Sequence, residues 1–207
     1  MYEIPYHKQL QAIIDGIDPL SPPSLLLHAC CAPCSSSVLE RLASHFRITV
    51  FYYNPNISSQ QEYEKREAEL KRLISLIPQK HPISFVSVGW EHETFLEMVK
   101  GYEEEPEGGA RCHRCYEMRL RRTARFAKRL KYDYFTTTLS LSPLKNAQKI
   151  NEIGQKLSAE YAVHHLPSDF KKQDGYKRSI ELSREYDLYR QDYCGCIYSI
   201  RTPKTQD

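Results

Sequence analysis

The stretch Leu25-Leu26-Leu27-His28-Ala29-Cys30-Cys31-Ala32-Pro33-Cys34 joins a short apolar run to three cysteines. Ser21-Pro22-Pro23 bounds the run upstream, which predicts a strand over 25–27, and the residues 38–42 beyond it predict a helix. The cysteines therefore fall on a strand-to-helix turn. In an open α/β sheet such turns lie at the ligand-binding edge, and the following helix points its positive dipole end there. A thiol in that place ionises readily, so the stretch predicts chemistry rather than packing.

The chain has 207 residues, of which 41% are hydrophobic and 27% are charged, and its formal net charge is +3. These values are typical of a soluble globular protein, and no long linker interrupts the sequence. We expect a single domain over 1–207, with a helix and a Pro-rich connection in 1–24 and a catalytic core in 25–199. The sequence has neither an apolar leader nor a stretch of roughly 18 apolar residues, so we expect a cytoplasmic protein that does not enter a membrane.

Strand and helix patterns alternate along the rest of the chain. Strands are expected at 48–53, 83–88, 134–139 and 162–166, and helices at 62–77, 93–100, about 115–131, from 142 onward, and about 175–189. This alternation is typical of a parallel, doubly wound sheet. We therefore predict an α/β fold with a mainly parallel sheet of about five strands.

Seven cysteines are present, an odd number that fits disulfide pairing poorly, and thiols stay reduced in the cytoplasm. Cys31-Ala32-Pro33-Cys34 alone would suit a thiol–disulfide oxidoreductase, in which a first thiol of low pKa exchanges disulfides with a second. Such an enzyme needs neither Cys30 nor the further cysteine pairs downstream. We keep this reaction as an alternative.

The other cysteines form two short-spaced pairs, Cys112-x-x-Cys115 and Cys194-Gly195-Cys196. Four thiolates at such spacings often hold a structural zinc ion, which makes a zinc-containing RNA-binding module a second alternative. A single zinc site would leave the first three cysteines without a role. An iron–sulfur cluster uses up to four thiolates and leaves the others for a second metal, so we favour a cluster.

The helix expected after Cys115 is strongly basic on one side and apolar on the other. Its cations are Arg119, Arg121, Arg122, Arg125, Lys128, Arg129 and Lys131. A solvated helix face is the usual explanation for such a run, whereas phosphate contacts with nucleic acid are the more specific one. Because the run follows a cysteine pair directly, we favour RNA binding.

Several motifs occur in one order along the chain and together are specific. They are His28-Ala29-Cys30-Cys31-Ala32-Pro33-Cys34, Tyr53-Asn54-Pro55-Asn56-Ile57, Glu62-Tyr63 with Arg66, Arg111-Cys112-x-x-Cys115 with Arg119-Leu120, Phe135-Thr136-Thr137-Thr138-Leu139-x-x-Ser142-Pro143, and Tyr189-Arg190-Gln191-x-Tyr193-Cys194-Gly195-Cys196. This ordered set resembles the cobalamin-independent epoxyqueuosine reductases of the QueH type, from about residue 25 to residue 199.

The resemblance implies a two-electron reduction that removes the epoxide oxygen of epoxyqueuosine at the tRNA wobble position, the final step of queuosine biosynthesis. It also implies a [4Fe–4S] cluster with a further metal ion, iron, close by, whereas the sequence does not identify the electron donor. The implied fold is a Rossmann-like sheet related to the pyrophosphatase-type tRNA-modifying enzymes. Those relatives bind ATP through a loop after the first strand; residues 30–37 occupy that place here, so we expect no ATP site.

The expected site residues follow from these motifs. We expect all seven cysteines to bind metal, with Cys31, Cys112, Cys115 and Cys194 at the cluster and Cys34 closer to the second metal. Candidates for catalysis are Cys30, Cys34, Tyr193 and Asp192, with Asp169 as a further proton donor. The residues expected to contact tRNA are Asn54, Asn56, Arg66, Arg119, Arg121, Arg122, Arg125, Arg129 and Arg190.

Overall fold

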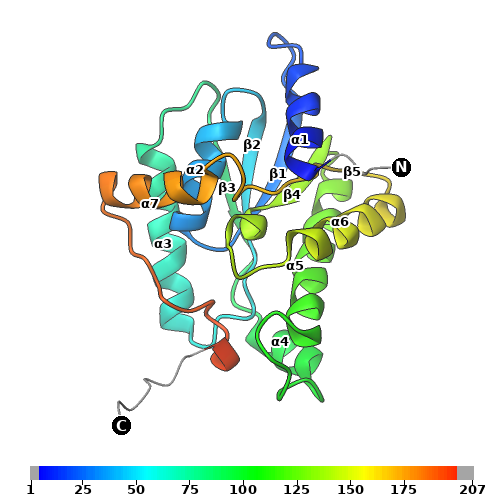
Figure 1. Ribbon diagram of the computed structural model, residues 1–207, viewed down its shortest axis with the longest axis vertical. Coiled ribbons are helices and arrows are strands. Elements are labelled where there is room, and N and C mark those ends of the chain that lie inside the picture. Colours follow the sequence, from blue (N-terminus) through cyan, green and yellow to red (C-terminus); the bar gives the residue numbers. More distant parts are fainter. Residues whose placement is uncertain (1–4, 200–207) are drawn as a thin grey trace.

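A computed structural model describes residues 5–199 of the chain (Figure 1). At its centre is a five-stranded sheet in the order β3-β2-β1-β4-β5, in which every neighbouring pair is parallel. The strands are β1 (Ser24–Ala29), β2 (Arg47–Tyr52), β3 (Ser84–Ser87), β4 (Tyr134–Thr137) and β5 (His164–His165). The predicted α/β class and parallel sheet are confirmed.

Helices cover both faces of the sheet. They are α1 (Tyr6–Asp15), α2 (Ala32–Leu42), α3 (Gln60–Leu76), α4 (His92–Val99), α5 (Ala110–Arg129), α6 (Ala147–Tyr161) and α7 (Gly175–Glu185), with 3₁₀ turns η1 (Thr138–Leu141) and η2 (Ile197–Ser199). Figure 1 shows α2 and α3 on one side of the sheet and α5 and α6 on the other, while α7 packs against α2. No helix within residues 5–199 is long and apolar enough to cross a membrane.

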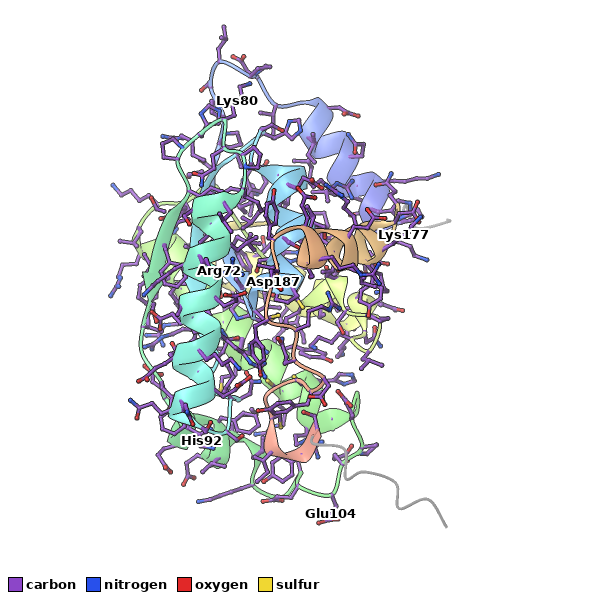
Figure 2. All side chains as sticks on the ribbon, turned by 90° about the vertical axis from the view of Figure 1, so that its left-hand side faces the viewer. Arg72, Lys80, His92, Glu104, Lys177 and Asp187 are labelled. Atoms are coloured by element: carbon purple, nitrogen blue, oxygen red, sulfur yellow. The ribbon has the colours of Figure 1, made fainter. Side chains whose placement is uncertain are left out.

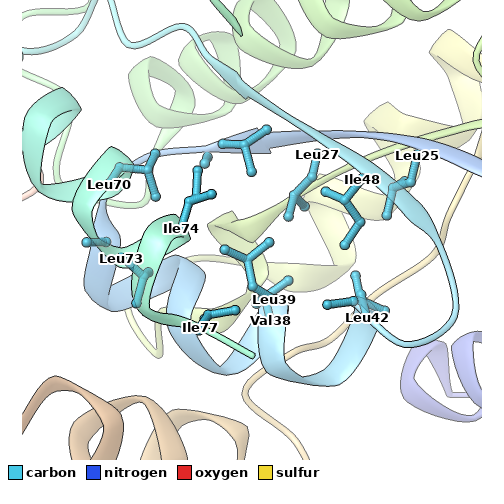
Figure 3. Packing of buried hydrophobic residues seen from close by; sticks show 14 of the residues in the cluster. Leu25, Leu27, Val38, Leu39, Leu42, Ile48, Leu70, Leu73, Ile74 and Ile77 are labelled. Atoms are coloured by element: carbon cyan, nitrogen blue, oxygen red, sulfur yellow. The ribbon is translucent and has the colours of Figure 1, made fainter. Parts of the chain in front are cut away.

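Strand β1 lies in the middle of the sheet and is buried on both faces. Leu25 and Leu27 belong to the core beneath α2 and α3, whereas Leu26 belongs to the core beneath α5 and α6. This division follows from the two-residue period of a strand, which sends successive side chains to opposite faces. Figure 3 shows the first core, in which the two leucines lie across from Leu39 and Leu42 of α2 and Ile74 of α3 packs in the same cluster. The central strand is therefore fixed by apolar packing from both sides.

The turn after β1 has the form that the sequence predicts. Cys31 is the N-cap residue of α2, and Pro33 lies in the first turn of that helix, where its missing N–H is no loss. All strands are parallel, so their carboxyl ends meet at one edge of the sheet. Cys30, Asn54 and Thr138 follow β1, β2 and β4 at that edge.

Some predicted boundaries are wrong. A helix was expected to start at Ser142-Pro143, but α6 begins at Ala147, because the side chain of Asn146 accepts a hydrogen bond from Lys149 N (3.0 Å) and caps the helix. Residues 142–146 instead form a turn over the sheet edge. The other boundaries differ by a few residues: α2 and α5 start earlier than expected, and β5 has only two residues.

On the α5–α6 face, His165 of β5 packs against Gly154 of α6. A Cβ built on Gly154 would lie 2.3 Å from Nε2 of His165, so this helical position has no room for a side chain. The imidazole is 9% exposed, and neither ring nitrogen has a hydrogen-bond partner among residues 5–199. Burial lowers the pKa of His165 to about 4, so the ring is neutral at neutral pH.

Gly154→Ala is expected to destabilise the protein by about 1–3 kcal/mol through overpacking against the imidazole. In a His165→Ala background the same change should instead stabilise the protein by about 1 kcal/mol, because alanine is the better helix former once the ring is absent. Urea unfolding of the four proteins in this double-mutant cycle measures the coupling. Additive effects at the two positions would contradict the contact.

The second prediction concerns pH. Since the folded-state pKa of His165 lies near 4 and its ordinary value is 6.5, the unfolded chain binds a proton between these limits that the folded chain does not. The stability contribution of His165 is complete above about pH 6.5 and falls by about 1.4 kcal/mol per unit as the pH drops toward 4. His165→Phe should remove this slope, and the same change at the exposed neighbour His164 is the matched control. Equal slopes in His165→Phe and wild-type protein would refute the prediction.

Candidate metal centre

Three sulfurs lie together at the end of β1. The Sγ atoms of Cys30, Cys31 and Cys34, hereafter the cysteine triad, are all within 4.8 Å of one another, and those of Cys30 and Cys31 are 3.7 Å apart. Cys31 is buried, whereas the other two are half-buried. Three thiols this close at a helix N-terminus could bind a metal ion, since the positive end of α2 favours their thiolate forms.

The other four cysteines, hereafter the four-cysteine group, come from two distant segments. Cys112 and Cys115 lie one turn apart near the start of α5, as predicted, and Cys194 and Cys196 follow α7. All four line a common cavity. Cys115 and Cys196 also pack with Phe95 in a small apolar cluster beside α4. The fold therefore brings both cysteine pairs to one place.

Residues 187–196, hereafter the C-terminal strap, run along α3 before reaching this place (Figures 1 and 2). Figure 2 shows Arg72 of α3 beside Asp187, and its guanidinium donates to the carbonyl oxygen of Asp187 (2.8 Å). Glu69 accepts a hydrogen bond from Tyr189 N (2.8 Å), and Arg66 donates to the carbonyl oxygen of Cys194 (3.2 Å). Helix α3 thus positions the last cysteine pair through polar contacts.

Gly195 allows the strap to come close to α3. Its φ of +97° is in the left-handed region, and a Cβ there would lie 3.0 Å from both Arg66 Nη1 and Ile57 Cγ1. Its carbonyl oxygen accepts from Ser58 N (2.9 Å). Only glycine meets the backbone and space requirements together.

A central cavity of about 430 Å³ lies between the triad and the strap. Its wall includes all three triad cysteines, Cys194 and the loop 142–145. Cys194 and Lys145 also line the cavity of the four-cysteine group. The two cysteine groups are therefore neighbours that share one wall.

The thiols of the triad share a negative charge unequally. Hydrogen bonds from Cys31 and Cys34 hold the pKa of Cys30 well below its usual range. The contact with Cys30 raises the pKa of Cys31 to about 12, and the contacts with Cys30 and Cys31 raise that of Cys34 above its usual range. Cys30 is therefore the first of the three to ionise. Since metal ligation needs thiolates, metal uptake at the triad releases protons.

In the four-cysteine group, burial is the largest cause of the pKa shifts. It raises the pKa of Cys115 to about 11 and that of Cys196 to about 12, and it also raises the pKa of Cys112. The backbone N–H of Gly108 points to Cys112 Sγ (3.3 Å). A bound cation would offset the cost of ionising these buried thiols.

Four of the residues expected to contact tRNA lie inside the protein instead. Asn54, Asn56, Arg66 and Arg119 are each at most 2% exposed. Asn54 donates to the carbonyl oxygen of Ala29 (2.9 Å), and Asn56 donates to that of Cys194 (3.4 Å). In this structure these side chains support the cysteine loops, and Arg66 and Arg119 also line the central cavity described above. Their expected contact with tRNA stays a prediction.

The remaining arginines of α5 differ among themselves. Arg121 is paired with Glu117 and Glu160, and Arg122 is paired with Glu91, so acidic partners already offset both charges. Arg125 and Arg129 are exposed. They lie about 15 and 21 Å along the helix from Cys115, at 1.5 Å per residue. Arg190 is exposed at the rim of the central cavity, where it donates to Ser183 Oγ (2.9 Å).

Both Tyr193 and Asp192 line the central cavity, as their expected catalytic role requires. The Tyr193 ring is 5.1 Å from the guanidinium carbon of Arg66. Asp169 instead pairs with Lys171 (2.8 Å) and is not among the cavity-lining residues.

Sequence reasoning missed Lys145, which lines both cavities. Burial lowers its pKa, but charge interactions with Cys194, Cys30 and Cys34 outweigh burial and raise the pKa above its usual value. Its position on the loop after β4, at the carboxyl edge of the sheet, is the signal that sequence analysis could have used.

Comparison with known proteins agrees with this geometry. Residues 25–202 match the family described as epoxyqueuosine reductase QueH. A protein of that name from Streptococcus pyogenes serotype M1 is 44% identical over 86% of this chain and 71% of its own length. Those from Staphylococcus epidermidis (42%; 95% and 85%) and Thermotoga maritima (34%; 86% and 90%) are also similar. Since the family match and the relatives span most of the chain, this protein belongs to the epoxyqueuosine reductase QueH family, as its motifs predict.

Proposed function

We propose that this protein is an oxidoreductase that removes the epoxide oxygen of epoxyqueuosine in tRNA and so forms queuosine. Family membership supports the reaction. The observation that carries the proposal is the placement of the two cysteine groups at neighbouring cavities that share Cys194 and Lys145, because seven thiols exceed the needs of any single metal site.

The donor sets fit two different metal groups. Four thiols from two separate pairs match the Cys₄ ligation of a [4Fe–4S] cluster, which we assign to Cys112, Cys115, Cys194 and Cys196. The triad sulfurs, all within 4.8 Å of one another, suit a single ion, which we take to be iron. This division differs from the sequence-based expectation, which placed Cys31 rather than Cys196 at the cluster.

The reaction consumes two electrons and two protons and releases the epoxide oxygen as water. When bound, the cluster supplies electrons one at a time, and the ion at the triad acts as a Lewis acid toward oxygen. The chain supplies the protons: Lys145 Nζ and the Tyr193 hydroxyl belong to residues that line the cavity, and Asp192 at its edge can return protons from solvent. Arg66 holds the Tyr193 ring in place.

The cavity also limits how the substrate enters. A volume of about 430 Å³ is in the range of small-molecule sites and accommodates one modified base, but not a paired stem. The wobble base must therefore leave the anticodon stack to reach the triad. Arg190 lies at the rim, where it can meet the backbone of the flipped nucleotide.

The third prediction tests the reaction and the metal assignment together. Under anaerobic conditions, protein reconstituted with iron and sulfide should convert epoxyqueuosine to queuosine in tRNA when given a chemical reductant, and it should hold more iron than one [4Fe–4S] cluster accounts for. Cys115→Ala should abolish cluster absorption and turnover. Cys34→Ala should keep the cluster spectrum, lose the additional iron and lose turnover.

Metal and sulfide analysis of each variant, with mass spectrometry of the digested tRNA, gives these results. Stoichiometric zinc without acid-labile sulfide would favour the RNA-binding module. A colourless protein that reduces disulfides and depends only on Cys31 and Cys34 would favour the oxidoreductase alternative. A normal cluster spectrum in Cys115→Ala would refute the ligand assignment.

The fourth prediction concerns tRNA binding by α5. Replacing exposed Arg125 and Arg129 by Gln should weaken tRNA binding and reduce its salt dependence by about one unit of logarithmic slope per lost phosphate contact. The matched double variant Arg121→Gln/Arg122→Gln should change the slope less, because acidic side chains already pair with both cations. Titration at several salt concentrations measures both slopes. An unaltered slope in the first variant would leave α5 with only a structural role.

A further inference from the structure

Arg119 of α5 is a fully buried cation. It is 1% exposed and is the largest of the fully buried side chains among residues 5–199. None of the ion pairs formed within those residues includes it. A buried charge without a counter-charge costs several kcal/mol, so the absence of a carboxylate partner needs a physical explanation.

The guanidinium contacts three side chains. Nε donates to His28 Nε2 (3.2 Å), Nη2 donates to Asn54 Oδ1, and Nη1 lies 4.0 Å from Cys115 Sγ. The guanidinium can only donate, so His28 Nε2 accepts from Arg119; the same nitrogen lies 3.1 Å from the carbonyl oxygen of Tyr53, and Nδ1 lies 2.7 Å from Thr137 Oγ1. Of the three partners, only the cysteine can carry a negative charge.

The same contacts tie Arg119 to the triad. His28 is two residues before Cys30 on β1, and Asn54 donates from Nδ2 to the carbonyl oxygen of Ala29 (2.9 Å), the residue before Cys30. Arg119 also lines the central cavity with all three triad cysteines and the cavity of the four-cysteine group. The guanidinium therefore lies beside both cavities. It contacts His28 and Asn54, which adjoin the triad, and Cys115 of the four-cysteine group.

We propose that Arg119 is a positioning residue that provides the internal counter-charge for both cysteine groups, so that it strengthens metal retention and favours electron uptake by the bound centre. The redox part rests on the proposed function, whereas the retention part holds for any metal bound by these thiolates. Thiolates bring more negative charge than the metals they bind can offset, and a guanidinium, which stays charged at all accessible pH values, compensates the excess.

Two substitutions separate charge from shape. Arg119→Gln removes the positive charge, so it should lose metal to a chelator about ten- to a hundredfold more readily than wild-type protein. Its reconstituted centre should also have a lower midpoint potential, since a nearby cation stabilises the reduced state. Arg119→Lys keeps the charge and should restore the potential, even though it cannot reproduce the forked contacts with His28 and Asn54. Arg121→Gln on the same helix is the matched control and should change neither property.

Asn54→Asp covers the case in which Arg119→Gln does not fold. It leaves Arg119 in place but gives the guanidinium a carboxylate partner. Like Arg119→Gln, it should therefore lower both the midpoint potential and the retention of metal. Wild-type potential and retention in a folded Arg119→Gln or Asn54→Asp variant would overturn the proposal. If the wild-type protein binds zinc and no cluster, the proposed function fails, while the chelator comparison with zinc still decides the role of Arg119.

Discussion

The crowding of like charges at the end of β1 is the constraint on which the site depends. Three sulfurs within 4.8 Å of one another repel as soon as more than one of them ionises, and the sheet interior offers little water to screen them. Positive charge therefore has to come from the protein. The N-terminus of α2, the buried Arg119 and the half-buried Lys145 supply it from three directions. The buried leucines of β1 hold the turn in place against this repulsion.

The four-cysteine group is held in a different way. Its first pair is on a regular helix, but its second pair is on a strap whose contacts with α3 are mainly hydrogen bonds, such as those from Arg72 and Arg66. An exposed contact such as that of Arg72 contributes little to stability, and the net contribution of each hydrogen bond is modest, so the strap gains less from folding than the apolar central sheet does. A metal bound by both cysteine pairs would add its binding free energy to the stability of the strap, the segment that gains least from folding.

The sequence was sufficient for the class of fold and for the position of the triad, because a short apolar run followed by Pro33 in a first helical turn has few alternatives. It was insufficient for the four-cysteine group, since spacing shows which thiols are paired but not which pairs meet. The burial of Arg119 was not predicted, because a run of arginines is typical of an exposed helix face. Yet Arg119 is one turn beyond Cys115 and next to Leu120, so its helical position already placed it on the buried face.

In the proposed function, the exposed arginines of α5 bind the tRNA backbone, whereas the modified base is recognised separately. In the proposed arrangement the buried Arg119 acts on the metal centre, whereas the exposed Arg125 and Arg129 are about 15 and 21 Å along α5 from Cys115. Contacts at that distance can orient an anticodon arm but carry no information about the modified base. In the proposed function, selection of the epoxide then comes from the central cavity, where only a base that has left its stack can reach the triad.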